Sequence, residues 1–284
     1  MLVQRAWAQV GREIDRPLDD WPPESLYATY LQYGCAIIRN AVDQSKLDQI
    51  RELANRIYLR KPGLHIYDPD FHEETQGCVS LLGLIDKPVL KELLNKVFVG
   101  QSFSVQSAVC RRIQGSESNQ DWQQPLDLHL DSQVHPFAFT VNHWIPFQNS
   151  GGDVAGIQFL PIDYRTTRIF CGFTGHQLRP ETEFNFHYFP EGCPNLQAVE
   201  RSFGPGCLIR PKINAGDVVL LSNWIVHGTY RTSTMKAGRM NAELRFIGEH
   251  IDIAVPKSGE IGARARPRFR KFLSASVRRL FSIR

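Results

Sequence analysis

The hydrophobic residues that follow Pro22 recur every three to four positions, which is the spacing of an amphipathic helix. Leu26, Tyr27 and Tyr30 belong to this run, and Gly34 interrupts it. The next residues, CAII, form a short β-prone segment. The pattern therefore predicts a helix that is followed at once by a strand.

A second helical run begins after Asp43, a residue type that stabilises helix N-termini by capping. Its apolar stripe consists of Leu47, Ile50, Leu53, Ala54 and Ile57. The segment VLKELLNKVF after Pro88 has the same spacing and predicts a further helix. Residues 62–78 mix Pro, Gly, Asp and aromatic residues without a regular period, so we expect a long loop there.

After Gly100 the pattern changes to short β-branched and aromatic runs that Gly, Pro, Asn and Asp separate. The runs are SFSVQSAVCRRI, FAFTVNHWIPF, VAGIQFLP, RIFCGF, GCLIRP, DVVLLS and ELRFIGEHI. Many short strands without helices between them indicate a sandwich or barrel. We therefore expect an α+β chain, with a helical N-terminal part at about residues 1–100 and a β core at about 101–255.

Composition supports one globular, soluble domain over residues 1–262. Of the 284 residues, 42% are hydrophobic and 22% are charged, and no apolar stretch approaches the roughly 18 residues of a membrane span. Charged residues interrupt the N-terminal segment before it could form a secretory signal, which predicts a cytoplasmic protein. The six cysteines include no CxxC pair, so we expect reduced thiols.

The tail at residues 263–284 differs from the rest of the chain. Residues 264–284 contain eight of the 33 Lys and Arg residues and none of the 29 Asp and Glu residues, so the remainder carries 25 − 29 = −4. Apolar residues recur among these cations at helical spacing, which predicts a basic amphipathic helix. This helix would contact an anionic membrane surface peripherally or pack on the acidic body. No nucleic-acid partner is expected, because the core lacks interleaved basic and aromatic residues.

The segment DLHLDSQVH at residues 127–135 carries the clearest chemical signal. On a strand, the period of two places His129 and Asp131 on one face, where both can bind one ion. His227 ends a strongly apolar run and is the best third ligand. Two histidines and one carboxylate leave coordination sites open, which suits Fe(II) oxygen chemistry better than structural zinc. Asp127 also lies two residues from His129 and is the alternative carboxylate.

Arg239 follows His227 by twelve residues and lies near the start of a further predicted strand. The guanidinium of Arg239 offers a planar fork to a carboxylate, although an arginine here could also be a hinge-loop cation. Among the remaining polar residues, His135 and His143 could line the pocket, but a histidine on such a strand is more commonly a hydrogen-bonded wall residue. A long segment further along the chain contains His176, Arg179 and His187. These residues could contact substrate or belong to a solvated loop.

Several segments together resemble the phytanoyl-CoA dioxygenase family of Fe(II)/2-oxoglutarate oxygenases. The resemblance covers roughly residues 26–250 and includes LQYGCAIIRNAVDQSKLDQIREL, HLD at 129–131, NHWIPF, GIQFLP, AGDVVLLSNWIVHG and GRMNAELRF. It implies a double-stranded β-helix (jelly roll, cupin-like) core flanked by N-terminal helices. It also implies the cofactors Fe(II), 2-oxoglutarate and O2.

The resemblance carries roles onto particular residues of this chain. It implies that His129, Asp131 and His227 are iron ligands, that Arg239 binds the carboxylate of 2-oxoglutarate, and that Trp144 lies near this cosubstrate. The arginine comes one residue later after His227 than is usual in the family, which leaves Arg245 as an alternative. We favour Arg239, because strand alternation places Asn241, Glu243 and Arg245 on its face and Ala242, Leu244 and Phe246 on the opposite one. After GIQFLP the chain also departs from the family pattern, so we expect an individual substrate pocket.

These observations predict a dioxygenase that hydroxylates a C–H bond of a small-molecule or of a lipid- or carrier-linked substrate. Succinate and CO2 would be released. The alternatives are a non-redox metal-binding jelly-roll protein, such as a cupin-like isomerase or sensor, and an inactive relative that acts as a binding module. Oxidative turnover of 2-oxoglutarate separates the first reading from the other two.

Overall fold

The computed structural model describes residues 2–60, 87–99, 103–114, 125–131, 140–163, 166–167 and 196–248. Several sequence predictions lie outside these residues. They are the loop at 62–78, the strand RIFCGF, the tail at 263–284, and the side chains of His135, His176, Arg179 and His187.

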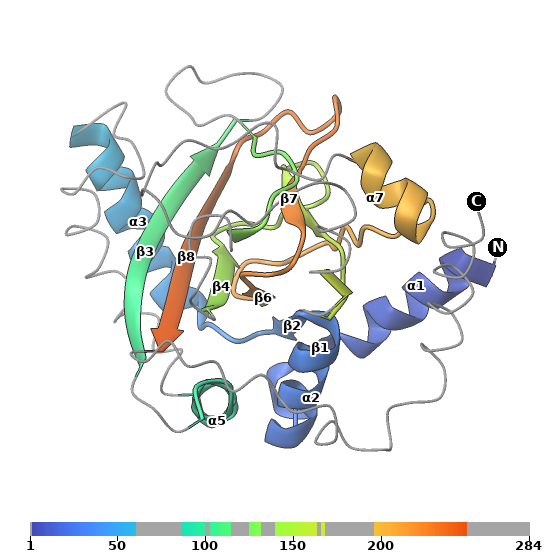
Figure 1. Cartoon of the computed structure of the whole chain (residues 1–284). Helices are drawn as coiled ribbons and strands as arrows, with labels where there is room; N and C mark the ends of the chain where they lie inside the picture. The colour runs from blue at the N-terminus through green and yellow to red at the C-terminus, as the bar shows by residue number, and fades with distance from the viewer. Residues whose placement is uncertain are drawn as a thin grey trace, which may run out of the picture.

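The helices predicted near the N-terminus are present (Figure 1). They are α2 (Pro23–Tyr33), α3 (Gln44–Arg60) and α5 (Pro88–Val97), and three short elements that we did not predict accompany them, namely α1 (Leu2–Glu13), the 3-10 turn Leu18–Asp20 and α7 (Leu196–Phe203). No helix in the described part of the chain is long and apolar enough to cross a membrane.

Gly34 ends α2 and starts the first long strand. It adopts φ = 68°, and its backbone N–H donates to the carbonyl of Tyr30 at 2.8 Å. This left-handed conformation is favourable only for residues such as glycine, which explains why the helix stops here. The predicted change from helix to strand therefore occurs at this glycine.

A six-stranded sheet forms the centre of the molecule (Figure 1). Its order is β1 (Asp15–Pro17), β2 (Cys35–Arg39), β6 (Val218–Ser222), β4 (Thr140–Pro146), β8 (Arg239–Gly248) and β3 (Phe103–Ile113), and only the β1–β2 pair is parallel. The middle strands β4 and β6 are buried along their whole length. Because both faces are covered, β6 reads VVLLS without alternation, whereas β4 also buries the polar residues Thr140, Asn142 and His143.

A smaller sheet pairs β5 (Gly156–Phe159) with β7 (His227–Tyr230) in antiparallel fashion. Isolated bridges lengthen it on both sides, because His129 pairs with His227 and Ile209 pairs with Phe159. Of the segments predicted as strands, the one around residues 206–211 therefore contributes a single bridge.

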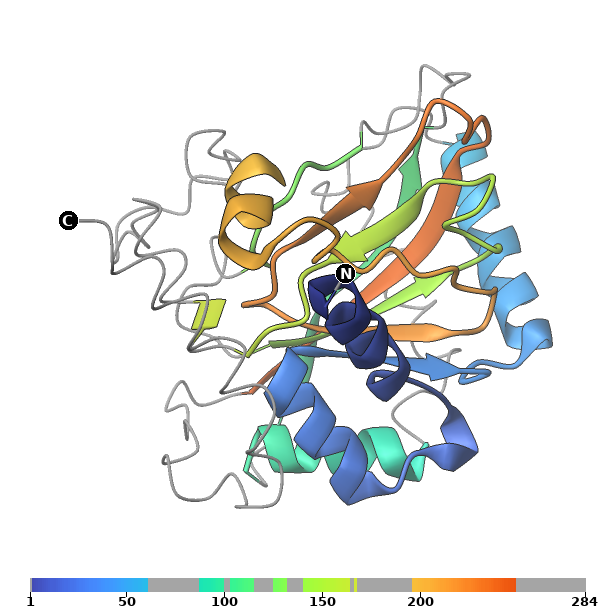
Figure 2. The same ribbon diagram turned by 90° about the vertical axis from the view of Figure 1, so that its right-hand side faces the viewer.

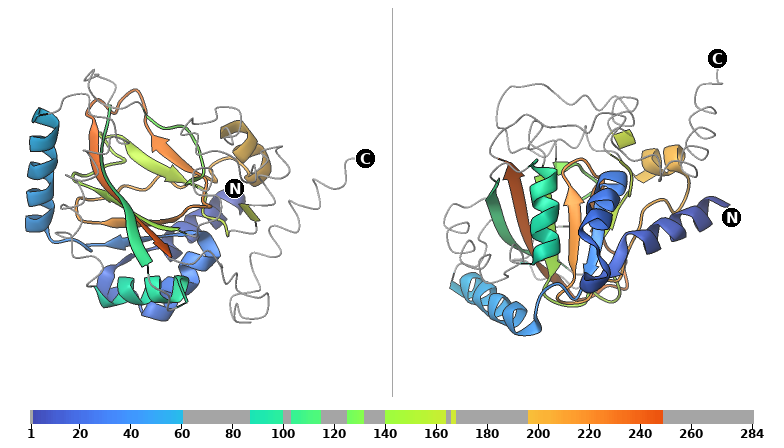
Figure 3. Two further views of the ribbon diagram at one scale, coloured as in Figure 1. Left: turned by 60° about the vertical axis from the view of Figure 1, so that its left-hand side comes forward. Right: turned by 90° about the horizontal axis from the view of Figure 1, so that it is seen from below.

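The large sheet separates two hydrophobic clusters. The helices α2, α3 and α5 lie outside this sheet (Figures 2 and 3), and their buried residues cluster with sheet residues such as Val141, Leu220 and Leu244. On the other face, Leu221 and neighbouring side chains pack against the small sheet and α1. The chain is thus a mixture of helices and antiparallel sheet in which helices cover one face and the small sheet covers the other.

His143 on β4 belongs to the helix-covered face, away from the large sheet's contact with the small sheet. Its side chain is completely buried, its ring centroid lies 4.6 Å from that of Phe246, and neither ring nitrogen has a hydrogen-bond partner among the described residues. Burial lowers the pKa of His143 to about 3. The ring is therefore a neutral core residue outside the cavity, and it lacks the hydrogen bond that sequence analysis expected of a wall histidine.

This burial predicts an acid-sensitive fold. An unfolded histidine titrates near pH ~6.5, so between that pH and about 3 the unfolded chain holds a proton on His143 that the folded chain lacks. The free energy of unfolding consequently falls by about 1.4 kcal/mol per pH unit as the pH drops through this window. We expect His143→Leu to remove this share of the slope in urea unfolding at several acidic pH values. An unchanged slope would contradict the assignment.

Candidate metal centre

His129 and His227 are joined by backbone pairing despite their separation in sequence. The N–H of His129 donates to the carbonyl of His227 at 2.8 Å, and the N–H of His227 donates to the carbonyl of His129 at 3.0 Å. Next to this bridge, the N–H of Thr229 donates to the carbonyl of Leu126 at 2.8 Å. The strand expected for the HLD segment is thus one bridge beside β7, which places the two imidazole centroids 4.3 Å apart.

Gly228 permits this close approach. A Cβ atom at position 228 would lie 2.8 Å from the carbonyl oxygen of Asp127, which is nearer than a Cβ atom approaches a backbone oxygen. Any larger residue would push the segment that carries His129 away from β7. The glycine that follows the distal histidine therefore has a steric role in the site.

Each imidazole is oriented by a hydrogen bond to a backbone carbonyl. Nδ1 of His129 lies 2.7 Å from the carbonyl oxygen of Asp127, and Nδ1 of His227 lies 3.0 Å from that of Ile225. A carbonyl oxygen can only accept, so Nδ1 is the protonated nitrogen in both rings. Nε2 is left as the atom that can bind a metal.

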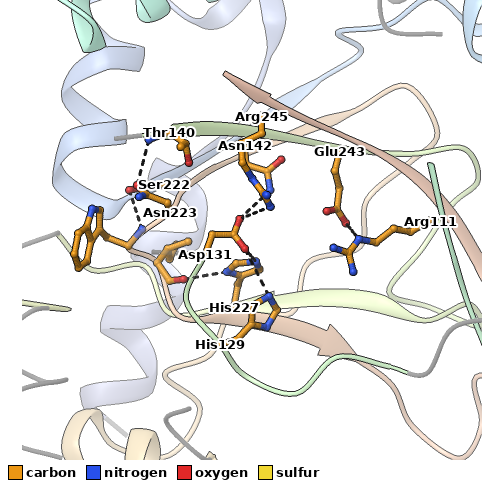
Figure 4. Close-up of polar contacts among 12 residues, drawn as sticks. Arg111, His129, Asp131, Thr140, Asn142, Ser222, Asn223, His227, Glu243 and Arg245 are labelled. Atoms are coloured by element: carbon orange, nitrogen blue, oxygen red, sulfur yellow. Dashed lines mark hydrogen bonds and ion pairs between the residues drawn. The ribbon is translucent and has the colours of Figure 1, made fainter. Parts of the chain in front are cut away.

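Asp131 meets both rings (Figure 4). Its Oδ1 lies 3.8 Å from Nε2 of His129 and 3.8 Å from Nε2 of His227. One potential ligand atom from each residue lies within 4.8 Å of the others, and all three residues are buried. The sequence prediction that these residues share one site therefore agrees with their placement.

The second oxygen of Asp131 faces the large sheet. Oδ2 accepts from the guanidinium NH2 of Arg245 at 3.0 Å and from Nδ2 of Asn142 at 3.4 Å. Burial is the largest single influence and opposes ionisation, but Arg245, His227, His129 and Arg111 together outweigh it and hold the pKa of Asp131 below its usual range. The carboxylate is thus ionised with one oxygen directed at the histidines.

His129 has the complementary protonation state. Burial, followed by the neighbouring His227, lowers the pKa of His129 to about 3. At neutral pH its Nε2 therefore carries a lone pair, as a metal ligand requires. Two imidazoles and one carboxylate form a donor set that fits a divalent first-row ion with open coordination sites.

Arg239 and Trp144 lie together in the same cavity as these three residues. The Cζ of Arg239 is 5.0 Å from the ring centroid of Trp144, Nε donates to Oδ1 of Asn241 at 2.9 Å, and NH1 donates to the carbonyl of Gly156. Burial lowers the pKa of Arg239 to about 10, so it is a cation at neutral pH. Among the described residues no carboxylate forms an ion pair with it.

The cavity lies between the two sheets. The three potential ligands line it together with Trp144 and Arg239. The cavity therefore brings the candidate metal ligands and a buried cation to one place.

A charged pair in the cavity escaped sequence analysis. Nε of Arg111 on β3 lies 3.0 Å from Oε1 of Glu243 on β8, and both residues line the cavity (Figure 4). Asn142 was likewise missed as a partner of Asp131. Alternation along β8 had placed Glu243 on the face of Arg239, but the register between β3 and β8 was needed to find Arg111.

The alternative residues lie elsewhere or are already engaged. The side chain of Asp127 is exposed, and only its carbonyl contacts His129. The guanidinium of Arg245 is bound to Asp131. The predicted alternation along β8 is observed, because Ala242 and Leu244 face the helix-covered cluster.

Structural comparison relates this fold to iron- and 2-oxoglutarate-dependent enzymes. The "non-heme alpha ketoglutarate dependent carbocyclase SnoK from nogalamycin biosynthesis" aligns with a TM-score of 0.56, 14% sequence identity, and coverage of 82% of this chain and 87% of SnoK. The "epimerase SnoN in complex with Fe3+, alpha ketoglutarate and nogalamycin RO" aligns with a TM-score of 0.54 and 14% sequence identity, over 84% of this chain and 91% of SnoN. EctD from S. alaskensis, crystallised with 2-oxoglutarate and 5-hydroxyectoine, aligns with a TM-score of 0.56 and 13% sequence identity, over 81% of this chain and 79% of EctD.

At these identities the likeness establishes a shared fold. No protein-family model matches the chain, and no curated protein matches its sequence. The three structural neighbours differ in the reaction or ligand that their descriptions name. The reaction of this chain must therefore be argued from its own site.

The contact at Gly228 leads to a test of the metal centre. We expect Gly228→Ala to separate His129 from His227 and to weaken Ni(II) binding by at least about tenfold in titration calorimetry. Gly152→Ala is the matched control, because a Cβ at position 152 would meet no atom within 4 Å. Equal Ni(II) affinity in the two variants would show that the close approach does not position the ligands.

Proposed function

We propose that this chain is an Fe(II)- and 2-oxoglutarate-dependent dioxygenase that hydroxylates a C–H bond of a small-molecule or lipid- or carrier-linked substrate. One observation carries the proposal. His129, Asp131 and His227 direct three ligand atoms to one point in a cavity that also holds the buried cation Arg239. The shared fold with enzymes of this chemistry supports it.

The donor set fits iron. Two imidazole nitrogens and one carboxylate oxygen would hold the ion and would leave its remaining positions for a chelating cosubstrate and O2. Sulfur ligands, which structural zinc sites commonly use, do not occur in this group. The carboxylate of Asp131 fills the position that a halogenating enzyme would need for halide, which favours hydroxylation.

The far end of the cavity fits the distal carboxylate of 2-oxoglutarate. Arg239 is fixed by Asn241 and by the carbonyl of Gly156, and the ring of Trp144 lies beside its guanidinium. The buried charge has no ion-pair partner in the described part of the chain, because Glu243, the carboxylate whose charge acts on it, is paired with Arg111. Burying a cation without a directly paired anion is costly. A carboxylate of the cosubstrate would supply that anion.

Bound Fe(II) and 2-oxoglutarate would supply the oxidising chemistry, coupling decarboxylation to succinate and CO2 with oxygen insertion into the substrate. The chain itself contributes orientation. The Nδ1 hydrogen bonds of His129 and His227 fix the direction of both Nε2 atoms, and Arg239 sets the direction of the cosubstrate. The packed walls of Ile157 and Leu221 exclude water from the reacting end.

Several finer assignments accompany the proposal. The facing sheets support a double-stranded β-helix, and the sequence motifs support membership of the phytanoyl-CoA dioxygenase family. We further propose a single catalytic domain over residues 1–262 in a cytoplasmic protein. The basic tail at 264–284 is proposed as a peripheral membrane contact that would favour lipid-linked substrates.

The central test is turnover of the cosubstrate. We expect wild-type protein with Fe(II), O2 and 2-oxoglutarate to release succinate, and Asp131→Ala to reduce this rate to background because the ligand is lost. Asp127→Ala is the matched control, since it removes an exposed carboxylate at the same spacing from His129. Metal binding without succinate release in the wild type would favour the non-redox alternative instead.

The role of Arg239 has a separate signature. We expect Arg239→Met to raise the KM for 2-oxoglutarate roughly 10- to 100-fold, the value of a charge-assisted hydrogen bond. The wild type should discriminate strongly against 2-oxobutyrate, which lacks the distal carboxylate, and the variant should lose this preference. Arg210→Met, at an exposed arginine that contacts Gln158, is the control. Retained discrimination in Arg239→Met would rule out the assignment.

A further inference from the structure

Asp131 is tied to the large sheet by two side chains that neighbour each other. Asn142 on β4 and Arg245 on β8 are register partners across the β4–β8 pair. Both donate to Oδ2 of Asp131, at 3.4 Å and 3.0 Å. Asp131 itself follows the segment that pairs with β7 of the small sheet. These hydrogen bonds therefore connect the two sheets at the metal centre (Figure 4).

Without a metal, the three ligand atoms repel one another. Nε2 of His129, Nε2 of His227 and Oδ1 of Asp131 are all electron-pair donors to a metal, and none brings a hydrogen to the others when Nδ1 holds the ring proton. A buried carboxylate in such surroundings needs a positive charge. Arg245 provides it on the opposite oxygen, at 3.0 Å.

The contacts of Arg245 indicate that Asp131 is its dedicated partner. Its side chain is 14% exposed, its only hydrogen bond to a described residue goes to Asp131, and its Nε is buried without a hydrogen-bond partner. Arg245 directs a single N–H at the oxygen that the histidines do not face.

We infer that Arg245, assisted by Asn142, is a positioning residue that neutralises Asp131 and reserves its Oδ1 for the metal, so that the metal centre is formed before the ion binds. The inference rests on the proposed function, because it assumes that a divalent ion binds at His129, Asp131 and His227. It goes further because it assigns Arg245 as the counter-ion of Asp131 in the metal-free state. The incoming ion then meets three ligand atoms that are already oriented for binding.

Thermal unfolding of full-length Arg245→Met and Arg245→Lys, without and with saturating Ni(II), tests the inference. Removing the charge leaves a buried carboxylate unpaired, so the metal-free Tm of Arg245→Met should fall by roughly 10 °C. Ni(II) should restore most of this loss because it supplies the missing charge. Arg245→Lys should lie between the wild type and the Met variant.

Arg112→Met is the matched control. Arg112 is a partly buried arginine on the neighbouring strand β3, and its Cζ lies 3.6 Å from the ring centroid of Tyr58, away from the metal centre. Its loss of stability should be the same with and without Ni(II). A merely structural role of Arg245 predicts the same metal-independent loss, and that result would overturn the inference.

The outcomes separate the inference from the proposed function. If the wild type binds no Ni(II), the metal centre and the role of Arg245 both fail. If the wild type binds Ni(II) but Arg245→Met shows no enlarged metal-induced increase in Tm, only the role of Arg245 fails. If the enlarged increase is found but the wild type releases no succinate with Fe(II), the positioning role stands and the oxygenase assignment fails.

Discussion

The metal centre depends on one pair of backbone hydrogen bonds, which join His129 to His227. Backbone pairing fixes two Cα positions across the bridge, and the Nδ1 contacts to carbonyls within the same segments then fix both rings. Side-chain hydrogen bonds alone would allow the segments that carry His129 and His227 to move relative to each other. Because the pairing requires Gly228 at the contact, a steric condition on the backbone precedes all the chemistry of the site.

The large sheet complements this bridge by the distribution of polarity on its inner face. The β6 side presents Leu221 and other apolar residues to the small sheet, whereas β8 presents Arg239, Glu243 and Arg245. A sheet that is apolar at one side and charged at the other can bury a core and still line a reactive cavity. Helices on the opposite face bury further hydrophobic side chains, and this burial offsets the free-energy cost of the charged side chains on β8.

Sequence patterns captured what depends on local periodicity. The helices after Pro22 and Asp43 and the alternation along β8 follow from spacing alone, and HLD beside a distal histidine suggested the ligand set. What escaped depends on register between distant strands. The pairing of Asn142 with Arg245, and of Arg111 with the neighbourhood of Glu243, is decided by how β4 and β3 align with β8. No local pattern encodes that alignment, because many registers satisfy the same alternation.

The two arginines on β8 show why this register matters for function. Arg239 and Arg245 lie on one face six residues apart, which corresponds to roughly 20 Å of strand. No single side chain spans that distance, so each can serve its own anion. Arg245 is committed to Asp131, which leaves Arg239 as the buried cation for a second carboxylate in the same cavity. The spacing along one strand thus separates the charge that balances the ligand from the charge that would orient the cosubstrate.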